Sequence, residues 1–136
     1  MAIGYINNDG RFDAVVSNNG GPAHVLMNLT ETKNHRVTFR YIGHKSNRDA
    51  IGTQVKITAG SSSQWGTVTT SSGYLSASDG RKHFGLGSNL AIDRIEIRWP
   101  SGIQQVLRNQ KIDQEIDEPA QSPSVKPVAG ADSPKP

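Results

Sequence analysis

Strict alternation of apolar and polar residues is the feature that most limits how this 136-residue chain can fold. The clearest examples are the segments HRVTFRYIG (35–43), TQVKITA (53–59) and DRIEIRWP (93–100). In the first of them, Val37, Phe39 and Tyr41 are separated by single residues, which places all three on one face of a β-strand. No segment carries apolar residues at helical spacing over three turns, so the sequence predicts an all-β domain.

Shorter strand candidates and turn signals fill the rest of the first 118 residues. The candidates are DAVVS (13–17), AHVLMN (23–28), WGTVTT (65–70), KHFGL (82–86) and IQQVLRN (103–109). Between them lie segments rich in turn-forming residues: SNNGGP (17–22), AGSSS (59–63), SDG (78–80) and WPSG (99–102). This spacing predicts roughly eight strands joined by hairpins, in a small antiparallel β-sandwich or barrel-like domain.

Composition excludes several classes of protein and site. The chain has no cysteine, so a disulfide framework and a thiolate site are both absent. Lys and Arg number 15 against 12 Asp and Glu, and the basic residues are scattered singly, which predicts a solvated surface and no nucleic-acid partner. No segment is apolar over the length of a membrane span.

The last 18 residues, 119–136, differ from the rest of the chain. They hold five of the seven prolines and no aromatic residue, so we expect an extended tail without a core of its own. Ser122, Ser124 and Ser133 in this tail resemble an O-glycosylated stalk, and Asn28 begins an N-glycosylation sequon. These four residues are candidate modification sites.

The segment YINNDGRFD (5–13) is close to a calcium loop of the form D-x-D-x-D-G-x-x-D. Oxygen ligands are required at its first, third, fifth and ninth positions, and a backbone carbonyl at the seventh. The candidates for these positions, after the first, are Asn7, Asp9, Arg11 (carbonyl) and Asp13. Tyr5 stands in place of the first carboxylate, and Arg11 adds a positive charge. The alternative is an Asx-type turn without metal, which the loss of that carboxylate favours.

A second polar group spans the segments SNRD (46–49) and SASDGRKH (76–83). Its members are Arg48, Asp49, Asp79, Arg81 and His83. They form either a polar binding pocket or a brace in which the acids cap turns and pair with the arginines, and the brace is favoured. A histidine beside Phe84 in an apolar run is typical of a packed strand residue. Nucleophile-elbow, zinc-protease and phosphate-loop motifs are absent, so we expect no catalytic activity.

Three segments follow one another along the chain: SNRDAIGTQVKITAG, SGYLSASDGRKHFGLG and IDRIEIRWPSGIQQVL. In this order and at this spacing they resemble the ASPIC and UnbV domain of secreted proteins, and the resemblance covers about residues 35–116. Residues 3–28 resemble an FG-GAP or VCBS repeat, a type that forms β-propeller blades and binds calcium. The resemblance implies an extracellular or cell-surface, non-catalytic protein. With the composition of the last 18 residues, it divides the chain into a partial repeat at 1–30, a β domain at 31–118 and a tail at 119–136.

A partial propeller repeat must find new backbone partners. An isolated hairpin is marginally stable in water, so residues 1–30 must fold onto the next domain, pair with another copy or fray. The sequence therefore predicts a secreted structural module that self-associates, as a homo-oligomer, filament or surface layer, through its N-terminal strands and its tail. The alternative is a monomeric extracellular adhesion module that binds calcium or a glycan.

Overall fold

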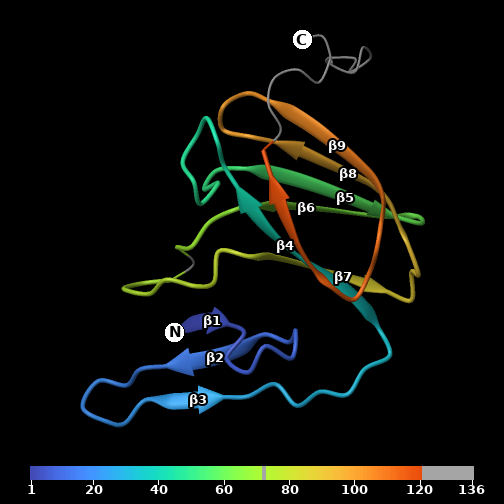
Figure 1. Ribbon diagram of the computed structural model, residues 1–136. Coiled ribbons are helices and arrows are strands. Elements are labelled where there is room, and N and C mark those ends of the chain that lie inside the picture. Colours follow the sequence, from blue (N-terminus) through green and yellow to red (C-terminus); the bar gives the residue numbers. More distant parts are fainter. Residues whose placement is uncertain (72, 121–136) are drawn as a thin grey trace, which may run out of the picture.

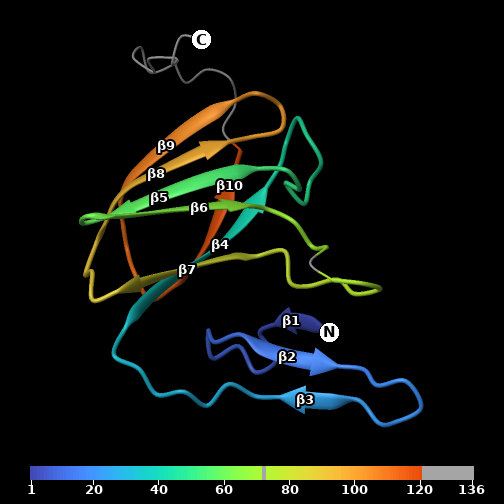
Figure 2. The same cartoon turned by 180° about the vertical axis from the view of Figure 1, so that it is seen from behind.

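The computed structural model describes residues 1–71 and 73–120, and this part of the chain is all-β. Its ten strands are shown in Figures 1 and 2: β1 (Ala2–Gly4), β2 (Asp13–Val16), β3 (His24–Leu26), β4 (His35–Ile42), β5 (Gln54–Ala59), β6 (Ser62–Thr67), β7 (Lys82–Gly87), β8 (Ile92–Arg98), β9 (Gln104–Gln110) and β10 (Glu115–Pro119). The described residues contain no helix that could cross a membrane.

Two of the three sheets form a sandwich. The strand order is β10-β4-β7 in one layer and β6-β5-β8-β9 in the other. The all-β sandwich predicted from the alternating pattern is thus confirmed, and β2 to β9 each overlap a predicted segment. β6 begins three residues before its predicted start, because Gly60 (φ 59°) and Ser61 form a two-residue turn that lets Ser62 pair with Ala59 at once.

β10 departs from the expected hairpin connections, because it pairs with β4 in parallel. Ile116 lies opposite Phe39, and the pairing continues to Pro119 opposite Ile42. Ala120 follows with its amide bonded to the Ile42 carbonyl (2.8 Å), and it is buried. The first two residues of the predicted tail therefore belong to the sandwich. The candidate sites Ser122, Ser124 and Ser133 lie outside the described residues.

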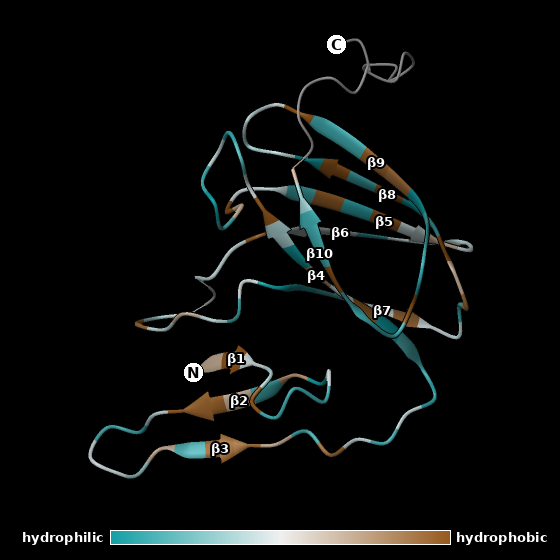
Figure 3. Ribbon diagram, viewed as in Figure 1, coloured by the Kyte–Doolittle hydropathy of each residue, from teal (hydrophilic) through white to brown (hydrophobic). Residues whose placement is uncertain are grey.

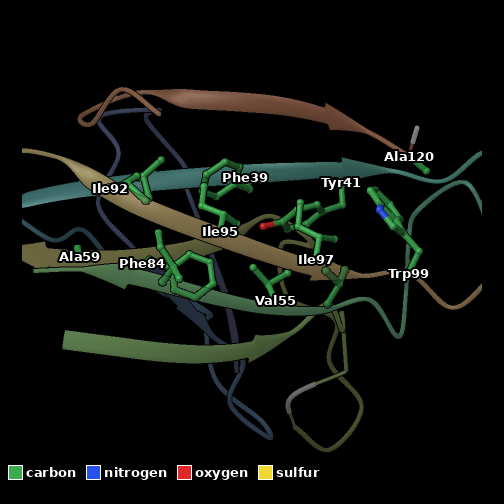
Figure 4. Packing of buried hydrophobic residues seen from close by; sticks show 14 of the residues in the cluster. Phe39, Tyr41, Val55, Ala59, Phe84, Ile92, Ile95, Ile97, Trp99 and Ala120 are labelled. Carbon is green, nitrogen blue, oxygen red and sulfur yellow. The ribbon is translucent and has the colours of Figure 1, made fainter. Parts of the chain in front are cut away.

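The core lies between the two layers of the sandwich (Figure 4). Phe39 and Tyr41 of β4 face residues of β5 and β8. Val37, on the same side of β4, is buried in the same cluster, and all three residues are at most 4% exposed. The remaining buried apolar residues are Ala50, Val55, Ile57, Ala59, Val68, Phe84, Leu86, Ile92, Ile95, Ile97, Trp99 and Ala120. This set contains every apolar residue that the alternation placed on the inner faces of the three clearest strands.

The third sheet, β1-β2-β3, lies apart from the sandwich at the N-terminal end of the molecule (Figures 1 and 2). β1 is its strand nearest the sandwich. The Asp79 amide donates to the Ile3 carbonyl (2.9 Å), and the Ile3 amide donates to Ser78 Oγ (3.2 Å). After their first residues, Asp13 and His24, the strands β2 and β3 are apolar (Figure 3), although neither strand is covered by a second layer. This sheet is called the N-terminal sheet below.

Candidate functional site

The loop that resembles a calcium site is held by its own hydrogen bonds. Asn7 Oδ1 accepts from the Asp9 amide (3.2 Å), and Asp9 Oδ1 accepts from the Arg11 amide (2.8 Å), which are two successive Asx turns. Asp9 Oδ2 accepts from Asn7 Nδ2 (3.0 Å). The Arg11 amide and the Asn7 side chain hold the pKa of Asp9 below its usual value. Both Asp9 oxygens are therefore engaged within the loop.

Asp13, the last position of the calcium pattern, is 2% exposed and supports the backbone. Its Oδ2 accepts from the Ile6 amide and its Oδ1 from the Asn28 amide, each at 2.9 Å. A calcium ion at this loop would have to replace these bonds and those of Asp9. Among the described residues, no three His, Asp or Glu side chains gather closely enough to hold a metal ion. The donor set fits a turn better than a calcium cage.

Tyr5, which stands in place of the first carboxylate of the calcium pattern, joins the N-terminal sheet to the sandwich. Its hydroxyl hydrogen-bonds His83 Nδ1 (2.9 Å) and Thr38 Oγ1 (3.2 Å), and its ring stacks on Phe12 with centroids 4.9 Å apart. Burial raises the pKa of Tyr5, and burial with the nearby Arg36 cation lowers the pKa of His83. His83 lies in β7 as a half-buried contact of this junction.

Arg81 is the centre of the predicted polar cluster. Its guanidinium pairs with Asp79 (2.5 Å) and Glu115 (2.8 Å), and it lies over the Tyr5 ring at 4.4 Å from the centroid. Burial alone would raise the pKa of Asp79, but hydrogen bonds from Arg81 hold it below its usual value. Arg81 therefore links β10, the β6–β7 loop and the N-terminal sheet.

The other two members of the cluster lie toward the loop after β4. Asp49 shares a cavity of about 230 Å³ with Asp79 and Arg81. The Arg48 carbonyl accepts from the Gly43 amide (3.0 Å), while its side chain is exposed. Asp49, Asp79 and Arg81 thus line one cavity, and Arg48 is not among its lining residues.

A larger cavity of about 350 Å³ lies between the N-terminal loop and the sandwich, lined in part by Tyr5 and Arg81. Arg36 also lines this cavity, and its Nη2 donates to the Asp9 carbonyl (2.8 Å). Gly10 (φ 78°) permits this approach, since a Cβ there would lie 2.1 Å from the Arg36 guanidinium. The charged groups around this cavity hold two parts of the chain together.

Asn28, the sequon residue, lies just after β3 and is partly buried. Its Oδ1 accepts from the Thr30 amide (3.1 Å), and its carbonyl accepts from Arg11 Nη1 (3.3 Å). The side chain on which a glycan would be attached is thus part of the turn that follows the N-terminal sheet.

The N-terminal sheet exposes apolar side chains on both faces. The register puts Ala2, Val15 and Val25 side by side on one face, which we call the first face. Ile3, Ala14 and Leu26 share the opposite one, the second face. Val25 is 55% and Leu26 57% exposed. The alternation of apolar and polar residues did not predict this exposure. β2 and β3 carry consecutive apolar residues, a pattern that is also typical of a strand buried on both sides.

One family model matches the chain. It is described as ASPIC and UnbV, and it covers residues 43–123, more than half of the 136 residues. The match begins after the N-terminal sheet, so the resemblance of residues 3–28 to a propeller repeat stays a prediction. No curated protein matches the chain.

Proposed function

This chain belongs to the ASPIC and UnbV family, and from that premise we propose that it is a non-catalytic structural module that assembles with copies of itself through the N-terminal sheet. The observation that carries the proposal is the exposure of apolar residues on both faces of that sheet. A single layer with two apolar faces needs a neighbour on each side to bury them.

The proposed contact is the first face of one copy on the second face of the next. The two faces differ in their side chains, so such a contact is head-to-tail and leaves a free face at each end. Growth then continues and gives a filament instead of a closed dimer. β3, the outer strand, has no second neighbour among the described strands, and its open edge is a further place for strand addition.

Charge favours a second copy as the occupant of these faces. Among residues of the three strands, only Asp13 and His24 are titratable, and Asp13 is buried under backbone hydrogen bonds. Two copies can therefore stack without bringing like charges together.

The non-catalytic part of the proposal is supported by the pairing around the two cavities. Arg81 is paired with Asp79 and Glu115, and the Tyr5 hydroxyl is bonded to His83 and Thr38. Groups paired in this way serve the junction between sheet and sandwich. We propose an extracellular setting because residues 35–116 resemble a domain of secreted proteins.

Two substitutions in β3 test the contact. Val25→Lys charges the first face and Leu26→Lys the second, and both positions are exposed enough to accept lysine in a monomer. Sedimentation velocity over about 1–100 µM, a range suited to micromolar contacts, should show assemblies for the wild type and monomers for each variant. A mixture of the two variants should form a dimer, because each supplies the face that the other lacks.

Leu90→Lys is the matched control, since Leu90 is 75% exposed and lies outside the N-terminal sheet. It should assemble like the wild type. A wild type that stays monomeric throughout would refute the proposal, and variants that each dimerise alone would show like faces packing together.

A further inference from the structure

The outer face of the four-stranded sheet carries a row of side chains that does not contribute to the hydrophobic core. The inner face of these strands holds Val55, Ile57, Ile95 and Ile97 in the core. On the outer face, the register aligns a row that runs across all four strands: Trp65, Lys56, Glu96 and Val106. This row begins with an aromatic residue at the edge strand β6.

Trp65 is 72% exposed, although tryptophan is mostly buried in folded proteins. Lys56 Nζ lies over the Trp65 ring, 5.3 Å from the ring centroid, and so limits the movement of the indole on that side. The ring borders an open concavity of about 530 Å³, together with Gln54, Gly66 and Thr67. A flat aromatic surface beside an amide and a hydroxyl matches the alternating C–H and O–H surfaces of a sugar ring.

The charges of this face are mostly positive. The cations Lys56, Arg94, Arg98 and Arg108 point to the same side as Trp65, and Glu96 is the single acid in their rows. Glu96 pairs with Lys56 (3.8 Å) and Arg94 (2.9 Å). Within the described part of the chain, Arg98 and Arg108 form no ion pair, and the shielded Arg94 Nε has no acceptor. Two guanidinium groups thus remain for an external anion.

We propose that this face binds an acidic polysaccharide. A pyranose ring would stack on Trp65, and carboxylate or sulfate groups further along the polymer would pair with Arg98 and Arg108. β6 and β8 are two strand spacings apart, about 10 Å, which is longer than one sugar ring, so the ligand is an oligomer. A single exposed indole with flanking Gln54 and Thr67 suits a sugar better than single-stranded nucleic acid, which stacks successive bases on several aromatic residues.

The site lies on the sandwich, and its binding does not depend on self-association through the N-terminal sheet. The test is calorimetric titration of the full chain with alginate, which carries carboxylates, with heparin, which carries sulfates, and with neutral dextran. We expect alginate or heparin to bind, dextran to bind much more weakly, and added salt to weaken binding. Binding should also shift the fluorescence of the exposed Trp65, whereas Trp99 is buried and should not respond.

Substitutions identify the face. Trp65→Ala should weaken binding about tenfold, and Arg98→Gln with Arg108→Gln should weaken it at least as much and reduce its salt dependence. The matched controls are Tyr74→Ala, which removes another exposed aromatic residue, and Lys33→Gln with Lys45→Gln, which removes two exposed cations elsewhere. Both controls should bind like the wild type. Equal losses in controls and test variants, binding to none of the polymers, or tighter binding of oligothymidylate than of either polysaccharide would each overturn the proposal.

Discussion

The sandwich and the N-terminal sheet are built from similar residues but differ in what covers them. Val37 in β4 is fully buried, whereas Val25 in β3 is 55% exposed. Both belong to strands whose backbone pairs with a neighbour. The difference is the second layer, which the sandwich supplies to itself and the N-terminal sheet does not. Backbone pairing forms a strand, but burial of its side chains provides most of its stability.

The largest expected difference comes from the same substitution in both regions. Val37→Ala should reduce the free energy of unfolding by about 2–3 kcal/mol, because it leaves a cavity in a closed core. Val25→Ala should change that of the monomer by less than about 0.5 kcal/mol. Denaturant titration at low protein concentration measures both. Equal effects would mean that the N-terminal sheet is as well packed as the sandwich.

Asp13→Ala should loosen the N-terminal sheet alone. It removes the acceptor of the Ile6 and Asn28 amides in a buried position, so local opening should become easier by about 2 kcal/mol. Amide exchange in β2 and β3 should accelerate while β5 and β8 keep their protection. A matching acceleration in the sandwich strands would show that the two regions unfold together.

Tyr41→Phe should stabilise the sandwich slightly. The Tyr41 hydroxyl is shielded from solvent and has no hydrogen-bond partner among the described residues, and burial raises the pKa of this phenol. Removing it relieves an unpaired polar atom, so we expect a gain of about 0.5–1 kcal/mol. Thermal unfolding of the two proteins under identical conditions measures the gain, and a loss would show that the hydroxyl has a partner in solution.

Acid should weaken the junction between the regions. The folded state lowers the pKa of His83, so its contribution to stability is present above the unfolded value of about 6.5 and is lost as the pH falls below it. His83→Gln removes this dependence. The difference in Tm between wild type and variant should therefore shrink from about pH 7.5 to about pH 5.5, and a constant difference would contradict the role of His83.

Calcium should have the smallest effect. The oxygens of Asp9 and Asp13 are already engaged, so about 1 mM calcium, the weak end of extracellular sites, should leave the Tm unchanged within about 1 °C. A clear rise that Asp9→Asn abolishes would show that the loop rearranges into a metal site.

The alternating pattern predicted the sandwich because a strand that buries one face has an apolar residue at every second position. It placed Val37, Phe39 and Tyr41 in the core, where they lie. β10 shows no such alternation, since Ile116 is the single apolar residue among its first four positions and the strand is defined by its pairing with β4. Parallel pairing between distant segments depends on tertiary structure, which local pattern does not encode.

The candidate sites show a similar division. The residue types of a calcium loop and of an Asx turn are the same, and only the hydrogen bonds of Asp9 and Asp13 distinguish the two. Alternation places Arg94 and Arg98 on one face of β8, and the register of β8 with β9 adds Arg108, which is distant in sequence, to the same face. Spacing along the chain therefore underestimated the concentration of positive charge.

Hydrogen exchange measured at several protein concentrations tests the central claim most directly. If the N-terminal sheet lacks its covering layers in a single copy, the protection of β2 and β3 should rise with concentration while that of β4, β5 and β8 stays constant. Protection of β2 and β3 that is already high in dilute solution and independent of concentration would contradict the account.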